Sequence, residues 1–395
     1  MFTRVASGEM PEQSTTTMLG AGREAASVHA AIDFFFPRQA AGSRVERVAG
    51  GFSGSQVLRV VLPSGAAWAL KQFPAACDAE RAVWLHRVIR HLRAAPLRWI
   101  PEVASGAGGS VWRDGSGGLW EMLSWMPGQP QAAPSGETQQ VMIEAVGALH
   151  TRAASLAHTP AGMRVSQAVG DRLEQCRRLL RDPWDGRYGQ TRSSCSWKGA
   201  AQGQAARLAA AVRLASEILQ ADGEQALRRV LDRQPRPVPC LPVLRDLTAD
   251  HFLLSETHEP GDFVGGGHGA GPPAVTGLID FHAARVDSPA CDLARLLGSW
   301  NAGLPSQEAI DQAVAWYRPQ ASCGVALPQD PRQLAALIGF FAATGVVLGL
   351  DNWFRWLLQE ERQFPDGEAV LARVETHLGA LAAAFRRLAT MPALV

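Results

Sequence analysis

The sequence predicts an α+β fold in two unequal lobes, a small antiparallel β-sheet with one helix followed by a larger, mostly α-helical lobe. Short β-rich runs near the N-terminus, a boundary at Pro127-Gly128 and long segments of helical periodicity after it predict this division. At 395 residues, with 47% apolar residues, the chain can bury a core in each lobe. We expect a flexible tail over residues 1–30, an N-lobe over 31–125 and a C-lobe over 126–395.

The N-lobe is predicted from three β-rich runs separated by Gly and Pro turns, at residues 45–48, 57–62 and 66–70. Over residues 78–92 the apolar positions recur at helical spacing with charged residues on the other face, so one amphipathic helix follows these strands. A second pair of strands flanks the Gly-rich turn at residues 114–118, and its later strand runs over 119–125. The first three runs indicate an antiparallel meander.

Helical periodicity dominates the C-lobe, with predicted helices at residues 139–156, 166–180, 205–219 and 224–231. Two strand-like runs, 252–255 and 275–279, are joined by a Gly-rich segment at 261–273 that lacks the Lys and Ser/Thr of a P-loop. Residues 334–350 carry no charge and approach the roughly 20 apolar residues of a membrane span. Because this run is short and contains Gly and Thr, we interpret it as a buried helix.

The charge balance argues against partners that depend on a strong electrostatic field. Lys plus Arg number 38 and Asp plus Glu 37, so the net charge of +1 favours neither nucleic acid nor an anionic membrane as a partner. The six cysteines are scattered without the paired spacing of a zinc site or a disulfide framework. The N-terminus lacks the charged and apolar regions of a secretory signal. We therefore expect a cytoplasmic protein.

A Gly-rich tip and a lysine form the first candidate site. Gly51, Ser53 and Gly54 lie between two predicted strands, where small residues let backbone N–H groups approach phosphate oxygens. Lys71, one of only two lysines in the chain, lies on the next strand and can neutralise phosphate charge. Glu80, at the start of the following helix, is a conceivable acidic partner for it. The alternatives are a plain tight turn and a surface lysine on a strand edge.

Two aspartates, each beside a short apolar strand, form the second candidate site. Phosphoryl transfer to a hydroxyl needs one carboxylate to orient the acceptor or accept its proton, and further ligands to fix magnesium against the phosphates. Asp246 and Asp280 can divide these roles. The alternative is that Asp246 caps a turn and Asp280 ends a strand, as single aspartates often do.

The segments around Asp246 and Asp280 resemble, in order and spacing, motifs of the aminoglycoside phosphotransferase and choline kinase-like family. Members of this family are distant relatives of protein kinases. The matching segments are Leu244-Arg245-Asp246 with His251 for the catalytic loop H-G-D-x-x-x-x-N, Ile279-Asp280-Phe281 for the strand end I-D-F, and residues 287–294 for G-D-P-x-x-D-L-A. Asp292, in the last segment, looks like the residue that braces the catalytic loop, and His150 ends a helix similar to the family's L-x-x-L-H helix. The likeness spans about residues 44–356.

The resemblance implies a protein-kinase-like two-lobed fold and the use of ATP with Mg²⁺, or with Mn²⁺ as the alternative. By this resemblance, Lys71 would bind the α- and β-phosphates, Asp246 would be the catalytic base and Asp280 would hold the metal. The hinge that binds adenine would be formed by Met122, Leu123 and Trp125.

Two positions depart from the family pattern. Leu244 stands where the catalytic loop has His, and His251 stands where it has the metal-binding Asn. Imidazole is a softer ligand than an amide oxygen and suits manganese or zinc better than magnesium. His251 is therefore a candidate metal ligand, and the neighbouring Asp250 is an alternative carboxylate.

The sequence thus predicts an enzyme, an ATP-dependent phosphotransferase that acts on a hydroxyl of a small molecule. The alternative is a catalytically impaired nucleotide-binding pseudokinase or scaffold, which the missing Asn suggests. A protein substrate has no support, because no A-P-E-like segment follows Asp280. Residues 129–234 contain more Arg than acidic residues, so we expect a polycationic aminoglycoside to be a poor acceptor. The sequence leaves the identity of the acceptor and the oligomeric state open.

Overall fold

A computed structural model of the protein describes residues 23–48, 56–74, 77–94, 96–131, 133–156, 162–188, 202–232, 236–255, 273–301, 303–321, 330–364 and 366–391. The chain forms two compact units, of which the first comprises Met1–Arg90 with Pro101–Trp125 and the second comprises His91–Ile100 with Met126–Val395. The predicted α+β class is confirmed, because the first unit is built on an antiparallel sheet and the second is mostly helical.

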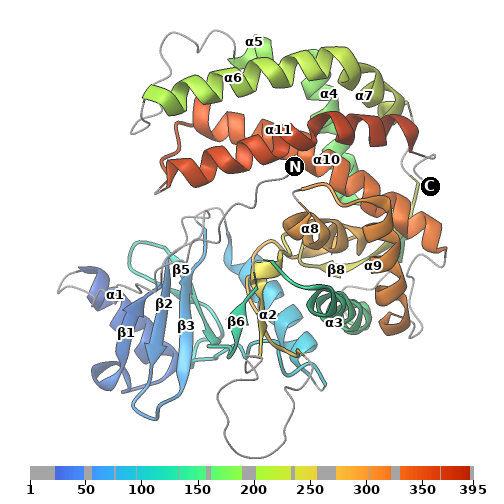
Figure 1. Cartoon of the computed structure of the whole chain (residues 1–395). Helices are drawn as coiled ribbons and strands as arrows, with labels where there is room; N and C mark the ends of the chain where they lie inside the picture. The colour runs from blue at the N-terminus through green and yellow to red at the C-terminus, as the bar shows by residue number, and fades with distance from the viewer. Residues whose placement is uncertain are drawn as a thin grey trace, which may run out of the picture. The chain divides into compact units, whose positions relative to one another are not determined.

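The first unit contains a five-stranded sheet in the order β1-β2-β3-β5-β4 (Figure 1). Its strands are β1 (Arg44–Arg47), β2 (Val57–Val61), β3 (Ala67–Gln72), β4 (Trp112–Arg113) and β5 (Leu119–Ser124). β1, β2 and β3 are consecutive antiparallel neighbours, so the meander predicted for the first three runs is confirmed, whereas β5 and not β4 pairs next with β3. The predicted helix after the third strand is also present, as α2 (Ala79–Arg93).

A helix whose first residues were expected to lie in a flexible tail packs on one face of this sheet. This helix, α1 (Arg23–Phe35), forms one buried cluster with strand residues that include Leu70 and Met122. Its own contributions to the cluster follow helical spacing: Val28, Ala31, Ile32 and Phe35. The expected tail over residues 1–30 is therefore wrong for residues 23–30, because the apolar face of α1 has a sheet to cover.

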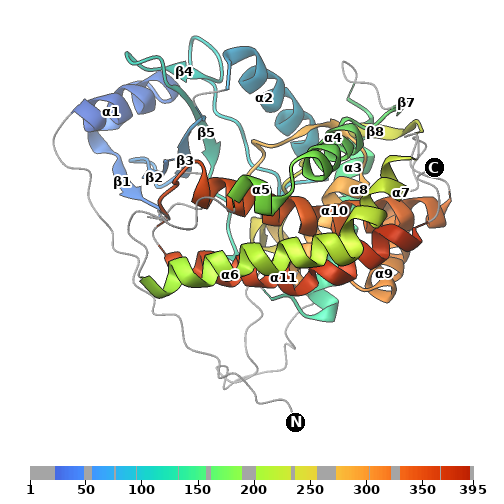
Figure 2. The same cartoon turned by 90° about the horizontal axis from the view of Figure 1, so that it is seen from above.

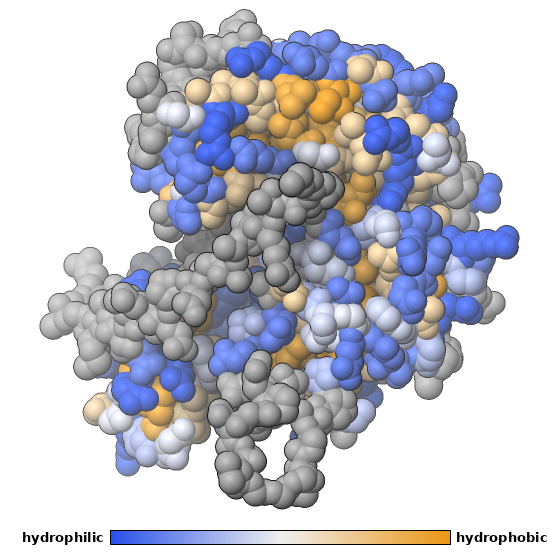
Figure 3. Space-filling model, viewed as in Figure 1, coloured by the Kyte–Doolittle hydropathy of each residue, from blue (hydrophilic) through white to orange (hydrophobic). Residues whose placement is uncertain are grey.

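Helices make up most of the second unit. They are α3 (Gly136–Ala154), α4 (Gln167–Arg181), α5 (Trp184–Tyr188), α6 (Gln202–Ile218), α7 (Glu224–Leu231), α8 (Ala290–Trp300), α9 (Gln307–Gln320), α10 (Pro331–Leu358) and α11 (Gly367–Thr390), with a π-helical turn, η3 (Leu219–Gly223), joining α6 to α7. α11 lies against both α6 and α10 (Figure 1, Figure 2). On the side of these helices seen in Figure 3, apolar residues show between hydrophilic ones.

The uncharged run at residues 334–350 lies inside α10. Among the described residues α10 is the one helix long and apolar enough to cross a membrane, and 78% of its most apolar 18-residue window is buried inside the protein. The Arg172 guanidinium from α4 donates to the Thr344 hydroxyl and to the Phe341 carbonyl of α10, and burial lowers the pKa of this arginine. The prediction of a buried core helix is therefore confirmed.

Two small sheets complete the second unit. In one, β8 (Val238–Val243) pairs with β7 (Gly162–Arg164) and β11 (Arg285–Asp287). In the other, β9 (Phe252–Leu254) pairs with β6 (Gln129–Pro130) and β10 (Val275–Leu278). Gly128, which has a φ of +104°, precedes β6, and a Cβ there would come within 2.2 Å of the Thr276 hydroxyl and 2.6 Å of the Leu254 carbonyl oxygen. The predicted Pro-Gly boundary thus permits β6 to approach the β9–β10 pair closely.

Candidate active site

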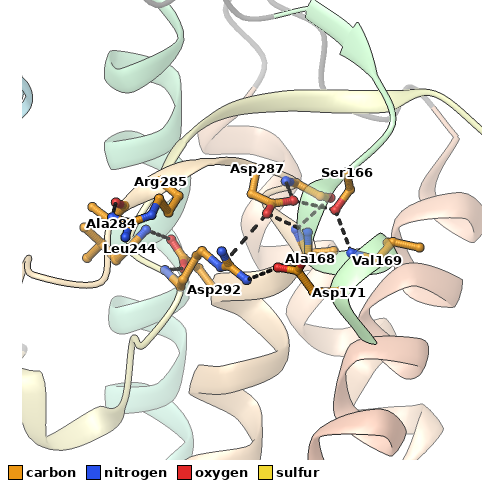
Figure 4. A network of polar contacts seen from close by, with 12 residues as sticks. Ser166, Ala168, Val169, Asp171, Leu244, Ala284, Arg285, Asp287 and Asp292 are labelled. Carbon is orange, nitrogen blue, oxygen red and sulfur yellow. Dashed lines mark hydrogen bonds and ion pairs between the residues drawn. The ribbon is translucent and has the colours of Figure 1, made fainter. Parts of the chain in front are cut away.

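The loop that follows β8 is anchored by a buried carboxylate. Asp292, fully buried on α8, accepts hydrogen bonds from the backbone amides of Leu244 (2.8 Å) and Arg245 (2.6 Å), the two residues before Asp246 (Figure 4). Two amides that converge on one carboxylate fix the path of this short segment. Asp292 therefore braces the loop, as the family resemblance implied.

A histidine and a tyrosine hold Asp292 in turn. The Nε2 atom of His150, on α3, lies 3.0 Å from Asp292 Oδ2, and His150 Nδ1 lies 3.0 Å from the Tyr317 hydroxyl. Burial, together with the nearby Asp292, raises the pKa of Tyr317 well above its ordinary value, so the phenol keeps its proton. The phenol then donates to Nδ1, which leaves the Nε2 proton of His150 for Asp292.

A second buried carboxylate, Asp287, fixes the segment on the other side of the loop. It accepts hydrogen bonds from the Ser166 hydroxyl, from the Ala168 amide (2.9 Å) and from the Ser288 amide (2.9 Å) (Figure 4). Ser166 also caps α4 by accepting from the Val169 amide. Asp287 thereby joins the start of α4 to the end of β11.

Asp246 differs from these two aspartates because its carboxylate reaches solvent. Its side chain is 53% exposed, and its Oδ1 accepts a hydrogen bond of 2.8 Å from Arg295 on α8. The preceding Arg245 has a φ of +65°, a conformation that costs free energy for a residue with a side chain and is concentrated at functional sites. The Asp292 hydrogen bonds to this segment offset that cost. The sequence thus places an accessible carboxylate on a rigid, strained turn.

The β9–β10 pair brings Asp280 and His251 together. Phe252 pairs with Leu278, and the Ile279 amide donates to the His251 carbonyl at 3.0 Å, so the residue before β9 lies beside the end of β10. Asp280 Oδ2 is 4.0 Å from His251 Nε2, which is too long for a hydrogen bond. Asp280 also has a positive φ, +62°. The two predicted metal-site residues of this unit are therefore neighbours.

The donors at this position fit a cation that binds together with a nucleotide. Magnesium in phosphoryl-transfer sites is usually held by one or two carboxylates plus substrate phosphates, and the carboxylate of Asp280 is 36% exposed. In the part of the chain that the structure describes, no group of three or more His, Cys, Asp or Glu side chains gathers to hold a metal. His251 Nδ1 is buried and makes no hydrogen bond there, whereas metal-binding histidines almost always anchor the second nitrogen. Asp280 is thus the stronger donor.

In the first unit, Lys71 lies on β3 at a position that faces β5. Its register partner across the ladder is Glu121, which is 1% exposed and bonded to His86 of α2. Glu80, the partner expected from the sequence, is exposed in the first turn of α2. The predicted tip residues Gly51, Ser53 and Gly54 lie outside the described residues, as does the Gly-rich segment up to residue 272.

Much of the predicted hinge is already hydrogen-bonded within the first unit. The Met122 carbonyl accepts from the Ala104 amide, and the fully buried Met122 side chain packs toward α1. The Trp125 amide donates to the Ala67 carbonyl at 3.0 Å. The first residue of β3 thus accepts from the Trp125 N–H, and the adenine-binding role expected of Met122 and Trp125 stays a prediction. The role of Leu123, which pairs with Ala69, stays a prediction.

A comparison with known families decides the identity of the chain. The sequence profile of the phosphotransferase enzyme family matches residues 44–337. The chain belongs to the phosphotransferase enzyme family. The resemblance that the catalytic-loop and I-D-F-like segments predicted is thus confirmed, and so is the prediction of an enzyme of this type. No curated protein sequence matches the chain.

Two solved structures resemble this phosphotransferase over most of its length. A complex of amicoumacin kinase with AMP-PNP, Ca²⁺ and Ami is 14% identical with a TM-score of 0.55, and the match covers 92% of this chain and 94% of that one. A complex of spectinomycin phosphotransferase with ADP and spectinomycin is 10% identical with a TM-score of 0.53, and the match covers 87% of this chain and 93% of that one. These similarities confirm the kinase-like fold.

Sequence reasoning missed three residues that lie opposite or bond to the residues described above: Glu121 opposite Lys71, Arg295 on Asp246, and Tyr317 on His150. Glu121 carried a signal, because a lone acid in the apolar run Leu119–Ser124 must find a partner when the strand is buried. Arg295 and Tyr317 carried no such signal. Arg295 contacts Asp246, 49 residues away in the sequence, and Tyr317 contacts His150, 167 residues away.

Proposed function

We propose that this protein transfers the γ-phosphoryl group of ATP to a hydroxyl group of a small molecule. One observation carries the proposal: Asp246 presents an exposed carboxylate on a turn whose two preceding amides are held by the buried Asp292. A rigid backbone with an accessible carboxylate suits a residue that must orient an incoming hydroxyl. Family membership supports the same reaction type.

In the proposed reaction, the acceptor oxygen forms a bond to the γ-phosphorus while the bond from that phosphorus to the bridging oxygen of ADP breaks. Asp246 orients the hydroxyl and accepts its proton. The leaving ADP keeps the electron pair of the broken bond on its terminal oxygen. Lys71 would pair with the nucleotide phosphates. Arg295, which binds the Asp246 carboxylate, would keep it oriented before the acceptor arrives.

Asp280, with His251 beside it, would hold the divalent cation. When bound, such a cation neutralises the charge that develops on the phosphates. Calorimetric titration of ATP with Mg²⁺ or Mn²⁺ tests this role directly. We expect Asp280→Asn to abolish metal-dependent nucleotide binding and the matched control Asp222→Asn, an exposed aspartate in the turn between α6 and α7, to leave it unchanged. Equal binding by the Asp280→Asn variant and the wild type would remove Asp280 from the site.

The acceptor is sought by following ADP release across a panel of hydroxyl compounds. The panel should contain neutral sugars, cyclitols and polycationic kanamycin-like aminoglycosides, and we expect the last group to be the poorest acceptors. ADP release that depends on one acceptor and on Asp246 supports the enzyme. Tight ATP binding without turnover for any acceptor, and without slow hydrolysis, would instead support the pseudokinase.

A further inference from the structure

We propose that Glu121, held by His86, is the carboxylate that positions the Lys71 ammonium, in place of Glu80. This inference rests on the proposed function, which assigns Lys71 to the nucleotide phosphates. All the observations behind it lie within the first unit.

The strand register places Lys71 and Glu121 on one face of the sheet. They are directly opposite partners in the antiparallel β3–β5 ladder, where opposite Cβ atoms lie about 5 Å apart. The adjacent pair, Leu70 and Met122, faces the core under α1. Because side chains alternate along a strand, Lys71 and Glu121 both point to the other side. A lysine side chain can easily span the distance to that carboxylate.

Helix α2 contacts Glu121 through His86. His86 is fully buried, and its Nε2 lies 2.7 Å from Glu121 Oε2. The second ring nitrogen, Nδ1, lies 2.8 Å from the Ser110 hydroxyl, so both nitrogens are engaged and the ring is fixed. The ring of Phe73, two residues after Lys71, is 6.0 Å from the His86 ring. The helix is thereby tied to the strand that carries Glu121.

A buried carboxylate of this kind requires a reason, because removing it from water costs several kcal/mol. Apolar residues of similar volume would often stabilise the fold as well or better. His86 occupies one oxygen of Glu121, and a carboxylate has about four acceptor sites in total. A carboxylate such as Glu121 can therefore accept from more than one donor, at a position that His86 holds still.

Glu80 lacks such support. It is exposed in the first turn of α2, where an acidic side chain interacts favourably with the positive end of the helix dipole. The neighbouring Asp78 already caps this end by accepting from the Arg81 amide at 2.7 Å. A mobile surface carboxylate holds a lysine less firmly than a buried one does.

The test is calorimetric titration of AMP-PNP with Mg²⁺ into the wild type and into Glu121→Gln, Glu80→Gln, Lys71→Met and the double variant Lys71→Met/Glu121→Gln. We expect Glu121→Gln to weaken nucleotide binding about 10- to 100-fold, the range for a misplaced site group, and Glu80→Gln to stay within about twofold of the wild type. We also expect the double variant to bind no more weakly than Lys71→Met, because Glu121 acts through the lysine.

Thermal unfolding separates positioning from a general loss of structure. If Glu121→Gln fails to fold, Glu121→Asp is used instead, because aspartate keeps the carboxylate and moves it by one methylene. The Glu121→Asp variant should still bind nucleotide more weakly than the Glu80→Asp variant does. Equal binding by Glu121→Gln and the wild type, or additive losses in the double variant, would overturn the inference alone. A wild type that binds no nucleotide would overturn the proposed function and this inference with it.

Discussion

Each unit of the protein holds a buried carboxylate with a helix-borne histidine, but the two pairs serve different neighbours. In the second unit, His150 holds Asp292, which accepts from two backbone amides. In the first unit, His86 holds Glu121, which lies across the ladder from the side chain of Lys71. The second ring nitrogen of the histidine contacts Tyr317 in the second unit and Ser110 in the first. The same pairing can thus brace a backbone or orient a side chain.

Mutations at Asp246 and Asp292 should affect different properties, although Asp292 holds the residues just before Asp246. The first should lower kcat, and the second should lower the free energy of unfolding. Asp246 is half exposed, so Asp246→Asn should leave the free energy of unfolding nearly unchanged. Loss of the proton acceptor should lower kcat about 10²- to 10⁴-fold. Steady-state kinetics with an acceptor from the panel, beside thermal unfolding, measures both. A variant of normal kcat would show that another group accepts the proton.

Asp292→Asn should mainly destabilise the protein. The new amide group would point a donor at backbone N–H groups that now share a carboxylate, which leaves a buried donor unsatisfied and removes a charge-assisted hydrogen bond. We expect a loss of about 3 kcal/mol in the free energy of unfolding, measured by urea denaturation. Asp250→Asn, at an exposed position, should shift it by less than about 0.5 kcal/mol. An Asp292→Asn loss as small as that of the control would refute the bracing role.

Tyr317 and Ser110 each contact the second ring nitrogen of the buried histidine in their unit. Tyr317→Phe and Ser110→Ala each leave Nδ1 of a buried histidine without its partner, so each should cost about 1–2 kcal/mol of stability. Their effects on nucleotide binding should differ. Ser110→Ala loosens the ring that holds Glu121 and should weaken nucleotide binding, whereas Tyr317→Phe should leave it unchanged. Calorimetry on both variants checks this, and equal affinities would mean that His86 has a purely structural role.

Much of this arrangement could be predicted locally, and the remainder depends on pairing between distant segments. The segments that form β2, β3 and α2 carry their own periodicity, and the order of Asp246 and Asp280 identifies the segments that resemble those of the family. The sequence pattern does not predict β8, because Pro239 and Pro242 lie within it and proline argues against a strand. The partner of Lys71 depends on β3 pairing with β5 rather than with β4, which no local pattern states.

α1 is a different case, because its signal was present in the sequence. Apolar residues recur at helical spacing from Val28 to Phe35, but the surrounding segment reads as polar and irregular. A short amphipathic helix becomes stable only when its apolar face meets a surface, and here the surface is the face of the sheet that contains Leu70. Tertiary contact therefore decides the structure of residues 23–30.

A third carboxylate, Asp114, is held by hydrogen bonds without a histidine, and it predicts the smallest effect. Burial by itself would raise the pKa of Asp114, but hydrogen bonds from Ser116, from the Trp120 indole and from the Gly118 amide outweigh it and lower the pKa to about 2. Since the unfolded chain binds this proton more readily, the stabilisation is present above about pH 4 and is lost as the pH falls toward 2.

Urea denaturation of the wild type and Asp114→Asn between pH 6 and pH 2 measures this contribution. The wild type should be the more stable protein at pH 6, and the difference should shrink as the pH falls below about 4. Ser116→Ala, which removes one of the hydrogen bonds, should show a smaller difference of the same sign. A difference that stays constant down to pH 2 would mean that the charge of Asp114 does not contribute to the stability of this turn.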